Sequence, residues 1–251
     1  MKQLSCKTIL LFAVGAILTA SCSKTDDRLP QVSPGLMPAT SKVKTQKSGS
    51  SETVYEYDAA GRVKKMITNG TCEYVCNYSS DSLVQTRYLA NGTVMETCHI
   101  KLNSNGLVEN YLNDSYPSVF IKYEFNTDKT TARKLNYDNG NLSNITWYFY
   151  NNGNLVKDST VNQGGNSGWY GRIYEYYTDK YSTLENPNKG QAFWGAGNKN
   201  ALKKVTYLTN GMTNATQDYQ VPEVDAQNRI SKIAIITNNA GTPAVYTYTY
   251  Y

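Results

Sequence analysis

The fold is decided by the stretch Tyr55-Glu56-Tyr57-Asp58-Ala59-Ala60-Gly61-Arg62-Val63. Its alternating aromatic residues are typical of a β-strand, and its glycine allows the positive φ that a tight turn needs. A second run of strand-forming residues follows at once, at positions 62–67. A strand, a short glycine-containing turn and another strand predict a β-hairpin.

The same hairpin pattern recurs along the chain. Turns of the form Asp/Asn-x-x-Gly/Asn, each followed closely by a hydrophobic residue, occur at 88–94, 103–108, 137–142, 150–156 and 225–230. Their spacing is irregular, which does not fit a strict solenoid. The composition agrees with hairpins, because the 251 residues include 22 Tyr, which favour strands, and 26 Asn, which favour turns.

The period-two pattern predicts which face of the sheet is buried. Near the end of the chain, Tyr246, Tyr248 and Tyr250 share one face, and Thr247 and Thr249 share the other. Such alternation indicates an antiparallel sheet with one aromatic and one solvated face. We therefore predict an all-β fold, a curved antiparallel meander of on the order of a dozen strands that closes in part into a barrel or packs as a sandwich.

The first residues are predicted to be a targeting signal rather than part of the fold. Residues 1–21 combine two lysines with an apolar run at 8–18, which is shorter than the ~20 residues of a membrane-spanning helix. Leu18-Thr19-Ala20-Ser21-Cys22 resembles the bacterial lipobox, in which a diacylglyceryl group is attached to the cysteine. An ordinary secretory signal is the alternative. We expect Cys22 to be lipidated and to hold the protein on a membrane.

The domain organisation follows from this signal. We predict a lipoprotein signal peptide at 1–21, the lipidated cysteine and a flexible tether rich in Ser, Thr, Lys and Pro at 22–52, and one β-hairpin domain at 53–251. Removal of 1–21 takes away two lysines and no acid, so the formal net charge falls from +5 to +3. That charge is too weak and too scattered to indicate a nucleic-acid partner.

Two resemblances refine the expected location and family. Ser23 after the cysteine, with Asp26 and Asp27 close behind, is similar to lipoproteins sent to the outer membrane or cell surface of Bacteroidetes. The stretch 55–63 resembles the YD repeat, and together with the lipobox the chain resembles Bacteroidetes lipoproteins of the DUF4595 kind. That resemblance implies YD-like hairpins from Thr53 onward with a variable insertion at Ser182–Asn200. It implies an outer-membrane lipoprotein on the surface or periplasmic face, and it is silent on activity.

Three cysteines remain after Cys22, and hairpin geometry predicts that they are free thiols. Counting outward from the turns pairs Gln85 with both Cys76 and Cys98, so the two cysteines lie about 9.5 Å apart across three strands. A disulfide needs Cα atoms within about 7 Å. Cys72 lies four residues before Cys76 on the same strand, which also excludes a local bridge. His99 adjoins Cys98 but points to the opposite face.

Few residues suggest a catalytic or metal-binding role. We interpret His99 as a surface strand residue, and Asp58, Asp138 and Asp225 as turn residues rather than general acids. The sequence carries no phosphate-binding glycine loop and no zinc-protease or serine-hydrolase motif. We expect no enzyme, no catalytic residue, no cofactor and no metal.

Aromatic residues in turn-rich segments are the candidate ligand contacts. They are Trp169 and Tyr170 after a glycine-rich stretch, and Phe193 and Trp194 in the expected insertion. Alternatively, the two tryptophans fold back to cap the sheet. The sequence favours a non-catalytic binding or adhesion module for a glycan or protein partner. A structural or assembly lipoprotein without a small ligand is the alternative, and a hydrolase is the third hypothesis.

Overall fold

The computed structural model describes residues 42–70, 72–163, 168–238 and 240–251. All of them belong to one compact unit. The predicted signal peptide at 1–21, Cys22 and the tether up to residue 41 lie outside the described residues.

The described residues form strands almost throughout, with two short 3₁₀ helices. The elements are β1 (Val43–Ser48), β2 (Ser51–Tyr57), β3 (Val63–Thr68), β4 (Cys72–Tyr78), β5 (Ser82–Leu89), β6 (Val94–Leu102), β7 (Val108–Asn113), β8 (Val119–Phe125), β9 (Thr131–Asp138), β10 (Asn141–Asn151), β11 (Asn154–Asn162), β12 (Trp169–Tyr181), η2 (Asn186–Lys189), η3 (Ala192–Trp194), β13 (Asn200–Thr209), β14 (Met212–Tyr219), β15 (Glu223–Val224), β16 (Ile230–Thr237) and β17 (Ala240–Tyr250).

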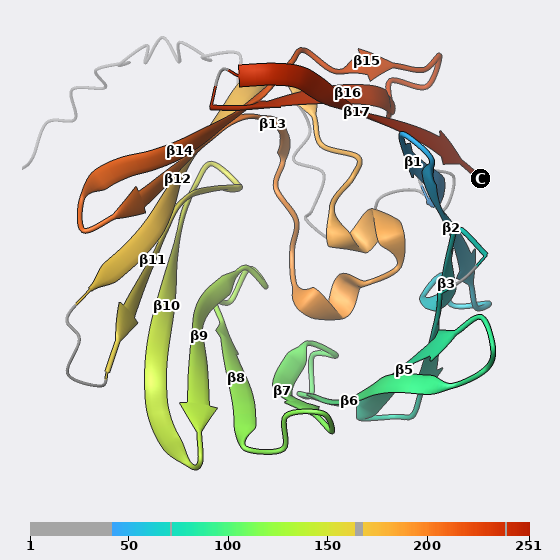
Figure 1. Cartoon of the computed structure of the whole chain (residues 1–251), viewed down its shortest axis with the longest axis vertical. Coiled ribbons are helices and arrows are strands. Elements are labelled where there is room, and N and C mark those ends of the chain that lie inside the picture. The colour runs from blue at the N-terminus through green and yellow to red at the C-terminus, as the bar shows by residue number, and fades with distance from the viewer. Residues whose placement is uncertain (1–41, 71, 164–167, 239) are drawn as a thin grey trace, which may run out of the picture. The chain divides into compact units, whose positions relative to one another are not determined.

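The strands form one antiparallel sheet that closes on itself (Figure 1). Each strand pairs with the next along the chain, with one exception. β14 pairs with one part of β16, and the short β15 pairs with the other part of β16. β17 then pairs with β1, with Val43 opposite Tyr250. The result is a closed barrel of 16 strands. The prediction of an all-β meander is confirmed, in its barrel form.

The strand that closes the barrel comes from the segment that we predicted to be tether. The predicted boundary at residue 52 is wrong, because β1 begins at Val43, which is fully buried inside the barrel. Thr45 on its other face bonds Thr249 of β17 through their hydroxyl groups at 2.7 Å. Lys44 and Lys47 are exposed. These two lysines gave the segment the composition of a tether.

The turn of the opening stretch owes its shape to Asp58. Its Oδ1 accepts backbone N–H groups of Ala60 and Arg62 at 3.0 and 2.9 Å, and its Oδ2 accepts Nε of Arg62 at 2.7 Å. Gly61 has a φ of 72°. Asp225 makes the matching bonds in its own turn. The structural interpretation of these two aspartates is confirmed.

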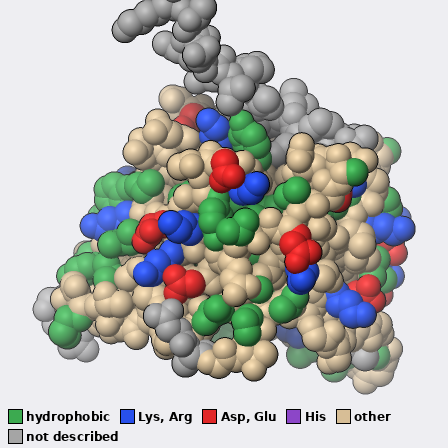
Figure 2. Space-filling model, turned by 90° about the horizontal axis from the view of Figure 1, so that it is seen from above, with side chains coloured by type: hydrophobic (Ala, Val, Ile, Leu, Met, Phe, Trp, Pro, Cys, Tyr) green, Lys and Arg blue, Asp and Glu red, His purple; other side chains and the backbone are tan. Residues whose placement is uncertain are grey.

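The tyrosine-rich face points into the barrel. The interior contains two clusters of buried hydrophobic residues, with Val43, Leu83, Ile100 and Phe193 in one and Ile230 and Ile233 in the other, and tyrosines pack against both. The outer face instead carries ion pairs between neighbouring strands, including Lys65–Glu73, Lys204–Asp218 and Lys232–Glu223. Figure 2 shows acidic and basic side chains side by side among apolar ones on one such face.

Candidate functional site in the barrel interior

The connection between β12 and β13 lies inside the barrel (Figure 1). We call residues 182–199, which include η2 and η3, the plug. Backbone hydrogen bonds join it to the wall: Val63 N–H donates to the Gly190 carbonyl at 3.0 Å, and Ala196 N–H donates to the Lys129 carbonyl at 2.9 Å. These partners lie at the β2–β3 and β8–β9 turns, so the plug occupies that end of the barrel, which we call the plugged end.

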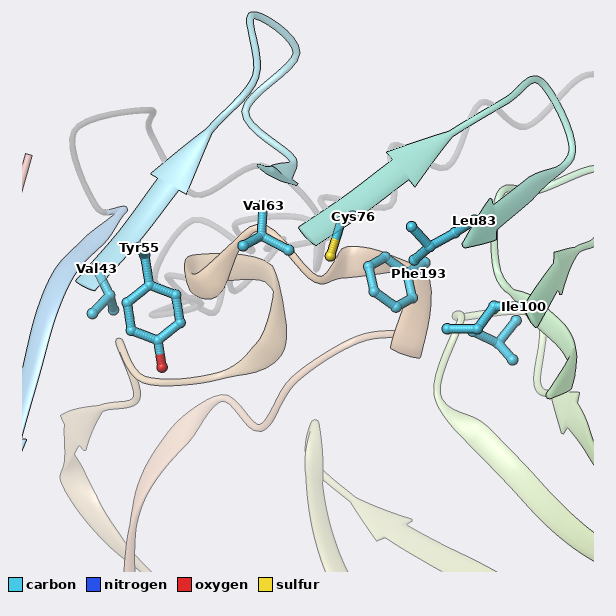
Figure 3. Packing of buried hydrophobic residues seen from close by; sticks show 8 residues of the cluster. Val43, Tyr55, Val63, Cys76, Leu83, Ile100 and Phe193 are labelled. Atoms are coloured by element: carbon cyan, nitrogen blue, oxygen red, sulfur yellow. The ribbon is translucent and has the colours of Figure 1, made fainter. Parts of the chain in front are cut away.

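Phe193 is a core residue. Its side chain is 7% exposed and packs in the cluster that includes Cys76, Leu83 and Ile100 (Figure 3). Its ring meets Tyr78 edge-on, with centroids 6.3 Å apart. The prediction of an accessible loop aromatic is wrong for Phe193, because the plug turns inward and buries its apolar side chains against the strands.

Trp194 is half-buried in the same place. Its ring lies 5.4 Å from that of Tyr123 and 6.3 Å from that of Tyr111, centroid to centroid. Both tyrosines belong to the inner face of the wall, on β8 and β7. Trp194 therefore folds back onto the sheet, as the alternative interpretation of the tryptophans predicts.

Trp169 and Tyr170 begin β12 rather than lie in a loop. Trp169 exchanges hydrogen bonds with Asn210, donating its N–H to Oδ1 at 3.0 Å and accepting the Asn210 N–H at 2.9 Å. Alternation along β12 places Trp169 on the outer face and Tyr170 on the inner face. Tyr170 is 48% exposed. The four candidate aromatics are therefore not brought together, and only Tyr170 is both inward and accessible.

The cysteine register is as predicted. Gln85 of β5 stands opposite Cys76 of β4 and Cys98 of β6. All three described cysteines are free thiols. Cys98 is buried and bonds the Tyr111 hydroxyl at 2.9 Å, whereas His99 is exposed on the other face beside Asp114.

A polar cluster on the inner face was not predicted from the sequence. Asp158 of β11 is buried, and its Oδ2 accepts Arg172 Nε at 2.8 Å and the Tyr174 hydroxyl at 2.7 Å. Arg172 Nη2 lies 2.6 Å from the same oxygen. Tyr148 stands opposite Asp158 on β10. Lys134 of β9 shares this face, because it stands opposite Thr146, two residues before Tyr148.

Solvent reaches this cluster although it lies inside the barrel. The Arg172 side chain is 44% exposed while its partner Asp158 is 3% exposed. A barrel of 16 strands is too wide for its own side chains to fill. Burial raises the pKa values of Tyr148 and Tyr174, so both remain neutral hydroxyl groups that can donate and accept hydrogen bonds.

A second polar group occupies the inner face of β4–β6. Arg87 Nε donates to the Cys72 sulfur at 3.1 Å and stands opposite Glu96. Glu96 Oε1 accepts Asn113 Nδ2 at 2.6 Å. The described residues include no group of three or more His, Cys, Asp or Glu that could hold a metal ion. No helix in the described ranges is long and apolar enough to cross a membrane.

No family model matches the chain, and no curated protein does. Solved structures match its fold. The chain is similar to a porin-like protein from Bacteroides uniformis. The two share 13% identity and a TM-score of 0.62 over 86% of this chain and 99% of the other. At this identity the likeness shows the fold alone.

Two toxin structures also align, over 80% of this chain but only 13% of their own length. They are a Tc holotoxin pore from Photorhabdus luminescens, at 9% identity and a TM-score of 0.31, and a TcdB2–TccC3 structure, at 10% and 0.29. Scores this low support no argument about the present chain.

Proposed function

We propose that the protein is a non-catalytic, lipid-anchored envelope protein that binds a glycan inside its barrel. The observation that carries this proposal is the solvent-accessible polar surface formed by Tyr170 and Arg172 of β12, with Tyr174 and the buried Asp158 bonded behind it. Small-molecule sites combine aromatic surfaces with a few fixed polar groups. Tyrosine suits carbohydrate especially well, because its ring stacks on a sugar face while its hydroxyl bonds sugar hydroxyls.

The interior favours a glycan over a folded protein partner. The plug occupies one end, and the inner face beyond it presents hydroxyl, amide and guanidinium groups rather than an apolar anchor site. The outer face, with its ion pairs between neighbouring strands, is suited to water. Anchoring through Cys22 would then hold a water-facing barrel at the outer membrane.

Binding is tested with the full chain, purified from a bacterial envelope in mild detergent and screened on an array of plant, host and microbial glycans. We expect a bound glycan whose affinity falls about tenfold in Tyr170→Ala. Phe149→Ala is the matched control, because Phe149 is 47% exposed, against 48% for Tyr170, and lies on the outer face. Absence of binding across the array would favour the structural or assembly lipoprotein instead.

The anchor is tested separately. Cells that express the full chain are grown with an alkyne-tagged palmitate analogue, and the purified protein is examined for the tag. We expect labelling of the wild type and none of Cys22→Ala. Equal labelling of the two proteins would refute lipidation at this cysteine without bearing on glycan binding.

A further inference from the structure

Away from Asp138, which is exposed at the end of β9, positive charges outnumber negative charges in the polar part of the barrel interior. The charged side chains found there in the described strands are Arg87, Lys134 and Arg172 against Glu96 and Asp158. Both carboxylates are occupied: Glu96 accepts from an asparagine and from Cys98, and Asp158 accepts from Arg172 and a tyrosine.

Lys134 is the cation without a countercharge. Within the described residues it forms no hydrogen bond and no ion pair, and its cross-strand neighbours are the uncharged Tyr123 and Thr146. No buried side-chain nitrogen or oxygen of the described residues lacks a partner. The unpartnered ammonium group of Lys134, which belongs to a half-buried residue, therefore contacts solvent.

Arg172 of β12, on the same inner face as Lys134 with β10 and β11 between them, retains unused donors. A guanidinium group carries five N–H donors in one plane. Asp158 engages Nε and Nη2, and Nη1 has no protein partner among the described residues. Arg172 therefore offers an anion further hydrogen bonds even while it holds Asp158.

We propose that Lys134 and Arg172 form an anion subsite, which binds a carboxylate or sulfate group carried by the ligand. This inference rests on the proposed function and narrows its ligand to an acidic saccharide. Charge-assisted hydrogen bonds from a lysine and an arginine are the usual means of holding such groups. Tyr148 lies between the two cations on the same face and is placed to contact the sugar ring.

The electrostatics of the unliganded site agree with the binding of an anion. Burial, and after it the charge of Arg172, lowers the pKa of Lys134. The positive charge on Lys134 is thus held at a cost in free energy. An anion between the two cations would relieve that cost, whereas a neutral sugar would not.

The experiment is calorimetric titration of the full chain with three probes: inorganic sulfate, the methyl glycoside of galacturonic acid, whose carboxylate is free, and the neutral methyl galactoside. We expect sulfate and galacturonate to bind and to lose about tenfold in affinity in Lys134→Gln. The matched control is Lys157→Gln, which removes the same charge from the outer face beside Phe149. Binding of galacturonate alone would identify a saccharide carboxylate as the source of the anion, and binding of sulfate alone would identify a sulfated one.

A second variant is expected to raise the affinity for sulfate rather than lower it. Asp158→Asn removes the internal carboxylate that competes for Arg172, so sulfate should bind more tightly than to the wild type. A merely structural role for these residues predicts no gain in affinity. Equal sulfate and galacturonate affinities in the wild type and Lys134→Gln, or no binding of either, would overturn the anion subsite. Glycan-array binding that depends on Tyr170 would in that case leave the proposed function standing.

Discussion

Truncation of one plug residue tests whether the plug belongs to the folded core. Phe193→Ala removes the ring of a residue that is only 7% exposed, and the loss leaves a gap against Tyr78, Leu83 and Trp194. Phenylalanine-to-alanine changes in well-packed cores cost about 3–5 kcal/mol of unfolding free energy. In a domain of this size that corresponds to a fall in Tm of about 10 °C.

The assay is thermal unfolding followed by near-ultraviolet circular dichroism, with Phe149→Ala as the control. Phe149 is 47% exposed on the outer face, so its truncation should cost less than about 1 kcal/mol. Limited proteolysis should cut Phe193→Ala within residues 182–199 before it cuts the strands. If the two variants melt together, Phe193 is not part of a packed core, and its interpretation as a ligand contact regains support.

Three further experiments test the barrel. Deletion of Thr247–Tyr251 removes β17 residues that pair with both β1 and β16, so we expect loss of soluble, cooperatively melting protein in size-exclusion and melting experiments; an unchanged melt would contradict barrel closure. Burial raises the pKa of Cys98 to about 11, so iodoacetamide at pH 8 meets mainly the unreactive thiol, and mass spectrometry should find the half-exposed Cys72 alkylated first; equal rates would argue against the burial of Cys98. Gly190→Ala should destabilise the fold by more than Gly106→Ala, because both have φ near 70° but only the new Cβ at Gly190 would meet a backbone nitrogen, that of Val63, at 2.5 Å; equal Tm values would place the plug away from the wall.

The hairpins and the cysteine register were predictable because tight turns fix them. Counting outward from Asn91-Gly92 as a two-residue turn places Gln85 opposite Cys98, and the structure contains this pair. The pair next to the turn is Tyr88 with Val94, and a register shift between Arg87 and Tyr88 makes up the difference. Period-two alternation then assigns the tyrosines to one face. These rules are local, and the structure confirms what they predict.

The polar cluster was not predictable in the same way. Asp158 and Arg172 stand opposite each other across a longer connection, between Asn162 and Trp169, and a long turn does not fix the register. β1 was missed because the exposed lysines resemble those of a linker. The inward course of Phe193 was missed because the plug has no strand periodicity, and only contacts with distant strands determine where it lies.

Closure of the barrel has a kinetic consequence. The hydroxyl bond between Thr45 and Thr249 joins residues 204 positions apart, and no shorter contact can substitute for this seam. Contacts so distant in sequence slow folding, because the entropy of loop closure is lost before the contacts form. Until β17 docks, β1 and β16 each present an unpaired edge that can add a strand from another molecule. Nascent copies would thus have a period of vulnerability to aggregation, ended by the arrival of residues 240–250.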